Sequence, residues 1–366
     1  MIRVLHTGDL HLDTPFAGLA PAKARLRRKE QRELLERLRA LVEERQIDVV
    51  LIAGDVFDSD HVFYETTHML ADVLGRMPAK VFIAPGNHDP YSDYSPYAAI
   101  QWPENVHLFR SEGMERVELP ELHAVVYGTA FTSKYRDNSP LEHFKAGYDE
   151  DMTRLMVLHG DLSPARGRYG SVTPEQIGAT GMDYVALGHI HRFTEVWKQQ
   201  DTAFAYCGCP EGRGFDECGE KGVLIGTVER GRADMAFLPI CRRRYEEVTL
   251  DVTGQDAAQL LSAASVSVTG DDIYRFHLTG EREGGPLRTQ ALSAMLANKY
   301  FDVQVLDETT PATDLWARAE EDTLTGLFLR KMRDRIELAE SPEERAELER
   351  AARFGLAALE GREEPR

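Results

Sequence analysis

Histidine, carboxylate and amide side chains recur in short, glycine-containing segments of the first 191 residues. Neutral imidazole, carboxylate and amide oxygen are the ligand types that suit Mn²⁺, Fe²⁺ and Zn²⁺. A shared carboxylate can hold two such ions ~3.5–4 Å apart, where they stabilise both the attacking and the leaving oxygen of one displacement reaction. The segments are Gly8-Asp9-Leu10-His11, Gly54-Asp55-Val56-Phe57-Asp58, Gly86-Asn87-His88-Asp89, His159-Gly160-Asp161 and Gly188-His189-Ile190-His191.

Each of these five segments lies at the C-terminal end of an expected strand. Because strand ends in an open α/β sheet converge on one crevice, we expect the five segments to meet in space. In Asp9-Leu10-His11 and in His189-Ile190-His191, alternate side chains point to the same side of an extended backbone, so both can reach one metal cluster. The glycines allow the backbone to turn sharply and to come close to a bound group.

Each segment taken alone also has a purely structural interpretation. A single histidine beside a strand end is more often a hydrogen-bonded structural residue than a ligand. Asp55 alone could be a helix cap or a turn residue, and Asn87-His88-Asp89 alone could be an ordinary loop. The coincidence of ligand-type residues at five separate strand ends favours a metal centre.

The elements that must position these residues follow an alternating pattern. From residue 1 to about 240, short apolar strands alternate with amphipathic helices, which predicts an α/β sheet buried on both faces. The expected strands are 2–5, 48–53, 80–84, 155–158, 184–187 and 222–229 with its hairpin partner 233–239, and the expected helices are 24–45 and 65–77.

The pattern restarts near residue 245 and indicates a compact α+β unit. Its expected strands are 247–252, 273–278 and 301–306, and its expected helices are 256–264 and 286–298. We therefore expect a catalytic domain over 1–243, a capping domain over 244–311 and C-terminal helices over 312–366. The fold class is then α/β: a sandwich of mixed sheets flanked by helices, with a small α+β capping domain and a helical C-terminal segment.

The C-terminal part is expected to form helices at 314–338 and 341–359. Ser341-Pro342-Glu343-Glu344 is a good helix start, with Ser as N-cap and Glu three residues later to close a capping box. The first helix carries an apolar stripe at helical spacing, which either packs on the chain's own capping domain or docks on a partner. The stripe consists of Leu324, Leu327, Phe328, Met332 and Ile336, with Leu329 beside it.

The overall charge limits how the protein could meet a nucleic acid. The net charge of −18 comes from 43 basic and 61 acidic residues and argues against binding through broad electrostatics, because phosphate contacts normally dominate affinity. It does not exclude an enzyme that acts on nucleic acid, since bound divalent metals reverse the local sign. Basic residues also concentrate at 25–29 and 242–244, where a solvated helix face or strand end is the alternative interpretation.

The composition and the N-terminal pattern also bear on where in the cell the protein is expected. No apolar run approaches the ~20 residues of a membrane-spanning helix, and the N-terminus enters a strand pattern without a signal-peptide layout. We therefore expect a cytoplasmic protein with no membrane association. The four cysteines are too few for a disulfide framework and lack the Cys-x-x-Cys spacing that suits zinc, so we expect thiols.

The five motifs, in their order along the chain, resemble those of the calcineurin-like metallophosphoesterases: Asp-x-His, Gly-Asp-x-x-Asp, Gly-Asn-His-Asp, a lone His and Gly-His-x-His. A narrower resemblance is to the SbcD-type DNA repair exonucleases, in particular their YhaO-like branch. It rests on His-Thr-Gly-Asp-Leu-His-Leu-Asp-Thr-Pro-Phe at 6–16 and on Glu-Gly-Arg-Gly-Phe-Asp-Glu-Cys-Gly-Glu-Lys-Gly at 211–222. The resemblance covers residues 1 to about 240 with specific motifs.

The resemblance implies a ligand set for two divalent ions, with Mn²⁺ as the expected metal and Fe²⁺ or Zn²⁺ as alternatives. Asp9, His11 and His191 would bind one ion, Asn87, His159 and His189 would bind the other, and Asp55 would bridge them.

The resemblance also implies two catalytic residues that are not ligands. His88 would meet the scissile phosphate and either stabilise the transition state or protonate the leaving oxygen. Asp89 would orient His88 or a metal ligand. Some relatives carry a histidine where this chain has Asp58, so a second phosphate-facing imidazole is not implied, and His61 is a nearby candidate substitute.

The function expected from this resemblance is hydrolysis of DNA phosphodiester bonds by a metal-activated hydroxide. The partners would be DNA as substrate and an SMC-like coiled-coil ATPase of the SbcC or YhaN kind, with a possible homodimer through the first domain. One alternative is a phosphoesterase acting on a small nucleotide or another non-DNA phosphoester. Protein phosphatases of the superfamily carry Gly-Asp-x-Val-Asp-Arg-Gly and Asn-His-Glu, whereas here Ser59 follows Asp58 and the third motif ends in Asp89. The intact ligand set disfavours a non-enzymatic scaffold.

Overall fold

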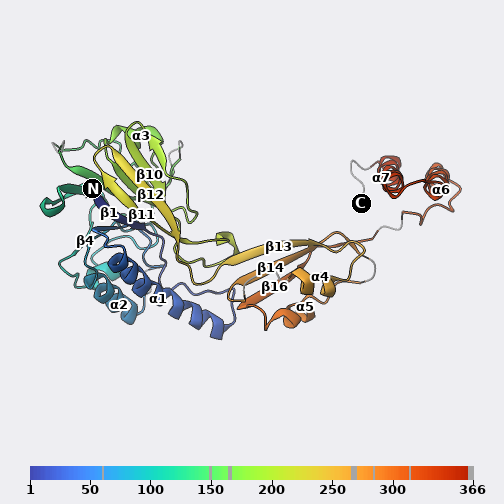
Figure 1. Cartoon of the computed structure of the whole chain (residues 1–366), viewed down its shortest axis with the longest axis horizontal. Helices are drawn as coiled ribbons and strands as arrows, with labels where there is room; N and C mark the ends of the chain where they lie inside the picture. The colour runs from blue at the N-terminus through green and yellow to red at the C-terminus, as the bar shows by residue number, and fades with distance from the viewer. Residues whose placement is uncertain are drawn as a thin grey trace. The chain divides into compact units, whose positions relative to one another are not determined.

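The computed structural model describes residues 1–59, 62–147, 151–163, 167–264, 270–282, 285–312 and 315–361. The chain divides into two compact units, of which the first contains Met1–Glu247 together with two short later segments, and the second contains most of the remaining chain (Figure 1). The expected division into domains over 1–243, 244–311 and 312–366 stays a prediction.

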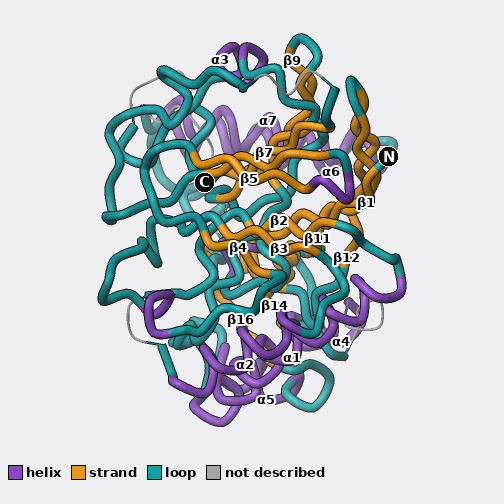
Figure 2. Tube along the Cα trace, turned by 90° about the vertical axis from the view of Figure 1, so that its left-hand side faces the viewer, coloured by secondary structure: helices purple, strands orange, loops and turns teal. Residues whose placement is uncertain are grey.

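Two six-stranded mixed sheets form the body of the first unit (Figure 2). The first sheet has the order β12 (Arg232–Pro239), β11 (Gly222–Glu229), β1 (Ile2–Thr7), β2 (Val49–Ile52), β3 (Lys80–Ile83) and β4 (Val106–Leu108). The second has the order β5 (Glu115–Leu119), β6 (Ala124–Gly128), β7 (Thr153–His159), β8 (Tyr184–Gly188), β10 (Thr202–Tyr206) and β9 (Trp197–Gln199). β1 to β4 run parallel, as do β6, β7, β8 and β10. The expected α/β sandwich of mixed sheets is therefore confirmed.

Alternation along the strands explains why both faces of each sheet are buried. In β2, Val49 and Leu51 belong to the core between the two sheets, whereas Val50 and Ile52 belong to a second core beneath helices α1 (Pro21–Glu44) and α2 (Tyr64–Gly75). A strand that packs on both faces has no polar side, and this gives the continuous apolar runs of the sequence. On the outer face of the second sheet, α3 (Pro174–Ala179) contributes to a third core.

Several short elements were not expected from the sequence. They are β4, β5, β6, β9, β10 and α3, together with the 3₁₀ turns Pro96–Ala99, Pro120–Leu122 and Phe215–Glu217. Strands of three to five residues are too short for a clear period, and β5 and β9 are edge strands with exposed positions.

The later part of the chain contains the expected small α+β arrangement. β13 (Tyr245–Asp251), β14 (Ile273–Thr279) and β16 (Asp302–Asp307) form a three-stranded sheet in that order, and β15 (Glu281–Arg282) pairs with β17 (Thr310–Pro311). Two short helices accompany them, α4 (Ala257–Ala264) and α5 (Thr289–Leu296).

The C-terminal helices are α6 (Leu324–Glu337) and α7 (Pro342–Leu359). The expected start of the first helix was wrong, because the described residues from 315 to 323 form turns and bends. The Thr323 hydroxyl caps the helix by accepting a hydrogen bond from the Gly326 amide at 3.1 Å, which fixes the start at Leu324. The Ser341 side chain caps α7 as expected by accepting a hydrogen bond from the Glu344 amide at 3.1 Å. The expected capping box is not closed, because the Glu344 carboxylate accepts from the Glu340 amide at 2.9 Å.

A buried cluster of ion pairs joins α1 to the segment that follows β10. The Arg27 side chain is fully buried, and it donates to Glu30 at 2.8 Å, to Glu211 at 3.0 Å and to the Gly212 carbonyl at 3.0 Å. Arg243 donates to the same Glu30 at 2.7 Å. These two basic residues therefore stabilise the first unit from inside and are not exposed to a ligand.

The cysteines are free thiols, as expected, and Cys207 and Cys209 are buried. Within the described ranges, no helix combines the length and the apolar character that crossing a membrane requires.

Candidate metal centre

The five sequence segments meet at the ends of β1, β2, β3, β7 and β8. The loops after β1 and β2 are joined by backbone hydrogen bonds of 2.9 Å, from the Asp9 amide to the Gly54 carbonyl and from the His11 amide to the Asp55 carbonyl. Asp9, His11 and Asp55 have φ values of 50°, 44° and 48°, a left-handed conformation that is uncommon for residues with a side chain. Such strained residues persist only where the surrounding structure holds them, and they concentrate at functional sites.

Two glycines are required by the close approach of these loops. A Cβ atom at Gly54 would lie 2.6 Å from Cγ of the His159 imidazole, and one at Gly86 would lie 2.8 Å from Cγ of the Asp55 carboxylate. Gly54 also has a φ of +86°, which a side chain would strain. The glycines thus bring ligand-type side chains from neighbouring strands into contact.

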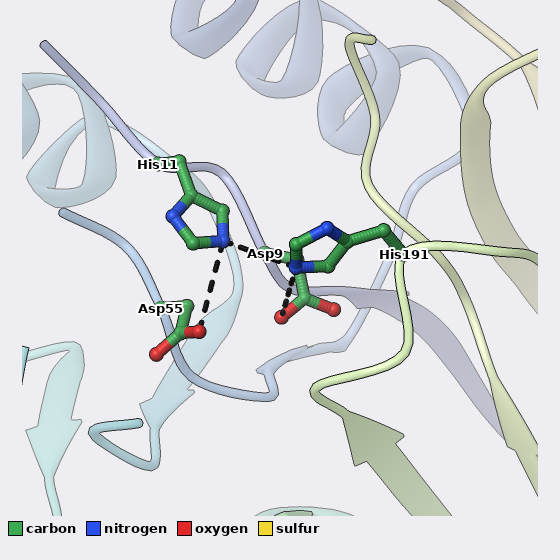
Figure 3. Close-up of side chains that lie close together, drawn as sticks. All are labelled: Asp9, His11, Asp55 and His191. Carbon is green, nitrogen blue, oxygen red and sulfur yellow. Dashed lines mark hydrogen bonds and ion pairs between the residues drawn. The ribbon is translucent and has the colours of Figure 1, made fainter. Parts of the chain in front are cut away.

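Four of the predicted ligands form a first cluster: Asp9, His11, Asp55 and His191 (Figure 3). Their donor atoms all lie within 4.8 Å of one another. Nε2 of His11 is 3.2 Å from Nε2 of His191 and 3.6 Å from Oδ2 of Asp55, and Nε2 of His191 is 4.0 Å from Oδ1 of Asp9. Asp9, His11 and Asp55 are buried, and His191 is partly exposed.

The other three predicted ligands form a second cluster. Oδ1 of Asn87 lies 2.9 Å from Nε2 of His159 and 3.0 Å from Nδ1 of His189. Nε2 of His159 is also 3.5 Å from Oδ2 of Asp55, the same oxygen that faces His11. Asp55 therefore adjoins both clusters.

The electrostatics differ among the site residues, because burial raises the pKa of Asp9, whereas for His191 burial acts to lower the pKa but Glu217 and Asp9 outweigh it and raise that pKa. Burial lowers the pKa of His11, and burial together with the neighbouring His159 lowers the pKa of His189 to about 4. Burial acts to raise the pKa of Asp55, but His159 and His11 outweigh it and hold that pKa below its ordinary value. A neutral imidazole carries a lone pair and an ionised carboxylate accepts only. This set of nitrogen and oxygen donors fits divalent cations of the Mn²⁺, Fe²⁺ or Zn²⁺ type.

His88 lies at the exposed side of the first cluster. Its ring centre is 4.9 Å from that of His11, and its backbone amide donates to Oδ1 of Asp55 at 3.0 Å. Donor atoms of His11, Asp58 and His88 also lie within 4.8 Å of one another, so these three residues are an alternative ligand group, distinct from the two clusters. The assignment of His88 to the phosphate and not to a metal stays a prediction.

Asp89 holds the backbone of two loops. Its buried carboxylate accepts hydrogen bonds from the Phe57 amide at 3.0 Å, from the Gly86 amide at 2.8 Å and from the Tyr97 hydroxyl. Burial and the nearby Asp55 raise the pKa of Asp89 to about 7. Among the described contacts none joins Asp89 to the His88 ring, so any orienting effect would act through the loop. His61, the candidate second imidazole, lies outside the described residues.

Two residues at the site were not predicted from the sequence. Glu217, in the 3₁₀ turn Phe215–Glu217, is buried and lies 2.7 Å from Nδ1 of His191, and Arg213 is hydrogen-bonded to it. Burial acts to raise the pKa of Glu217, but the hydrogen bonds from His191 and Arg213 outweigh it and hold that pKa well below its ordinary value. Both residues belong to the stretch 211–222, whose sequence carried a family resemblance but no spacing that indicated a role.

Comparison with known proteins gives one family and two informative relatives. A family described as calcineurin-like phosphoesterase matches residues 2–193, a range that contains all five segments. The uncharacterized metallophosphoesterase YhaO of Bacillus subtilis strain 168 is 30% identical over 261 residues, which are 68% of this chain and 63% of that protein. SbcD, a component of the nuclease SbcCD of the same organism, is 29% identical over 275 residues, which are 63% of this chain and 67% of that protein. The match thus spans less than two thirds of the length of YhaO.

The position of Asp55 between the clusters generates a prediction about metal content. Asp55→Ala should lose most of the bound Mn²⁺, because both ions would lose a ligand. Bound manganese is measured by elemental analysis after Mn²⁺ loading and gel filtration. Asp72→Ala, at an exposed carboxylate on α2, serves as the control and should bind as the wild type does. Full Mn²⁺ content in a folded Asp55→Ala protein would contradict the bridging role.

Proposed function

The chain belongs to the calcineurin-like phosphoesterase family, and on this premise we propose that it is a two-metal phosphodiesterase that hydrolyses DNA. The observation that carries the two-metal part is the position of Asp55. One of its oxygens, Oδ2, lies 3.6 Å from His11 in the first cluster and 3.5 Å from His159 in the second. A buried carboxylate oxygen that faces both groups of ligand-type side chains is what a bridging ligand requires.

The residues that would hold the metals divide into the two clusters. Asp9, His11 and His191 would hold one ion, Asn87, His159 and His189 the other, and Asp55 both. Bound there, two divalent ions supply Lewis acidity, a lowered pKa for water and compensation of charge on a phosphate.

His88 is proposed to act on the phosphate. Its side chain is exposed while its backbone amide is fixed on Asp55, so the ring can face a substrate without moving the loop. From there an imidazolium can donate a proton to a leaving oxygen, and a neutral N–H can stabilise developing negative charge. The buried Asp89 would keep this loop in place.

DNA is proposed as the substrate because one of the relatives is named as part of a nuclease. A cleft of about 580 Å³ lies beside His189 and His191, so a phosphodiester has room near the clusters. Its lining carries both signs of charge, with Arg192 and Lys221 beside Asp216, Glu217 and Glu247, so positive charge for a phosphate would come mainly from bound metal. The competing candidate is a small nucleotide or another non-DNA phosphoester, which the same cleft would also admit.

Hydrolysis assays distinguish these candidates. The protein is loaded with Mn²⁺ and incubated with labelled single-stranded DNA, labelled double-stranded DNA and a small chromogenic phosphodiester. The proposal expects DNA cleavage that depends on Mn²⁺ and disappears in Asp55→Ala. Hydrolysis of the small diester without DNA cleavage would favour the alternative substrate, and metal binding without any hydrolysis would favour a non-enzymatic role.

The proposed role of His88 gives a separate prediction. His88→Ala should retain two Mn²⁺ ions but lose at least ~10²-fold in hydrolysis rate, the usual effect of removing a positioned acid or charge-stabilising group. His68→Ala, at an exposed histidine on α2, is the matched control and should keep the wild-type rate. Loss of an ion together with the rate would make His88 a ligand, as its grouping with His11 and Asp58 would allow.

We further propose that α6 and α7 bind a coiled-coil ATPase of the SbcC kind. Part of the predicted apolar stripe is internal to the helix pair, since Leu329 is buried against Ala352 and Leu356 of α7. Leu324 and Leu327 of α6 and Leu338, the residue directly after it, are instead exposed, and their separations place them on one side of the helix. The relative from the nuclease SbcCD is named as one component of a larger enzyme, which supports an assembly with a second protein.

Surface substitutions in the full chain test this docking. Leu324→Lys combined with Leu327→Lys should abolish co-purification with an SbcC-type ATPase from the same genome while leaving Mn²⁺ content and the melting temperature unchanged. Met295→Lys, at an exposed apolar residue of α5, is the control and should retain the complex. Undiminished co-purification of the double variant would remove this face from the interface.

A further inference from the structure

We propose that Asp58, Arg213 and Glu217 act together as positioning residues for His11 and His191, and so set the affinity of the first metal ion selectively. The proposal rests on the two-metal function above. These three residues, called the outer triad below, touch the histidines on the side away from the first cluster. All of the contacts that carry the argument lie in the first unit.

On the His191 side, the triad presents a buried carboxylate. Oε1 of Glu217 is 2.7 Å from Nδ1 of His191, and only 3% of the Glu217 side chain is exposed. Arg213 binds this carboxylate three times over, through Nη2 at 2.6 Å, Nε at 3.1 Å and its backbone amide at 2.7 Å. Glu217 is therefore held in place and cannot turn away from the imidazole.

On the His11 side, the triad presents a second carboxylate. Oδ1 of Asp58 is 3.2 Å from Nδ1 of His11, whose side chain is fully buried. The same Asp58 oxygen accepts a hydrogen bond from Nη1 of Arg213 at 3.1 Å. One guanidinium thus connects the two carboxylates that contact the outer nitrogens of both histidines.

This arrangement selects one tautomer of each imidazole. Nδ1 of His191 lies 2.9 Å from Nη2 of Arg213, which can only donate, and at the shorter distance of 2.7 Å from the Glu217 carboxylate, which can only accept. The shorter contact requires a proton on Nδ1 of His191. The 3.2 Å contact between Oδ1 of Asp58 and Nδ1 of His11 does not have the geometry of a hydrogen bond, but the nearby carboxylate favours a proton on that nitrogen electrostatically. The Nε2 atoms of the two rings are 3.2 Å apart, and their lone pairs are then available to a metal ion in the first cluster. Such carboxylate partners orient a ligating imidazole and raise its basicity.

The second cluster does not use the triad. Nδ1 of His159 lies 2.9 Å from the carbonyl oxygen of Ala53, so the backbone of the sheet orients this ring. Nδ1 of His189 lies 3.0 Å from Oδ1 of Asn87, and none of the described hydrogen bonds or ion pairs joins this ring to the triad. Loss of a triad carboxylate should therefore weaken the first ion and leave the second ion bound.

The test is a Mn²⁺ titration of the full chain followed by electron paramagnetic resonance and elemental analysis. The wild type should bind two ions per chain. Glu217→Ala should weaken one ion by ~10–100-fold, the range for loss of an outer hydrogen-bond partner, and should retain the other at wild-type affinity. Glu217→Gln should restore part of the loss, because its amide oxygen can still accept from His191. Asp216→Ala changes an exposed carboxylate on the same turn and should have no effect.

The results distinguish an error in the proposed two-metal function from an error in the proposed role of the triad. Fewer than two ions in the wild type would refute the two-metal function itself. Two ions in the wild type with unchanged affinities in Glu217→Ala would refute the triad, as would equal weakening of both ions. Metal-free melting temperatures identify a variant that does not fold, and if Glu217→Ala is such a variant, the same criteria apply to Glu217→Gln.

Discussion

The burial of two carboxylates without a cationic side chain is the constraint on which the rest of this structure depends. Asp9 and Asp55 are both 1% exposed, and none of their described contacts is with a lysine or an arginine. Burying an unpaired charge is costly, and backbone amides with neutral imidazoles compensate it only in part. Divalent cations held by the clusters would complete the compensation. The nearby arginines lie outside the donor groups, where Arg213 pairs with Glu217 and Asp58 and Arg27 pairs with Glu211. The inner charge is the part that a metal would compensate.

Much of this site could be predicted from the sequence because its residues are local to strand ends. A buried strand followed by glycine and a ligand-type residue indicates both the element and the direction in which the loop points, and all seven predicted ligands lie in the two clusters. Glu217 could not be found in this way, because its contact with His191 depends on where the segment after β10 crosses the site. The same holds for Tyr97, whose hydroxyl binds Asp89 from a turn that the sequence pattern did not indicate. The three-residue strands β4 and β9 are too short to show a period.

The basic residues illustrate why composition alone is a weak guide to substrate. Arg27 and Arg243 belong to the two runs that could have formed a phosphate-binding surface, yet both side chains are at least 90% buried and are paired with glutamates. Their positive charge is neutralised inside the first unit and does not attract a polyanion. With a net charge of −18, approach of DNA would then rely on local cations such as Arg192 and on the metals themselves. From this distribution of charge, the proposed DNA substrate should bind more strongly when divalent metal is present.

The strained loops connect the site to the stability of the fold. Asp9, His11 and Asp55 hold left-handed backbone conformations, each of which costs on the order of 1–3 kcal/mol, and their loops are joined by backbone hydrogen bonds that a relaxed loop would lose. At these three residues the fold imposes a backbone conformation that the residue types disfavour, and such conflicts are common at functional sites. The buried carboxylates of Asp9 and Asp55 repel each other. Since this repulsion and the backbone strain exist only in the folded chain, an ion that relieves the repulsion would bind the folded state and stabilise it. The geometry that fits this site for a divalent ion would therefore also make the stability of the first unit depend on that ion.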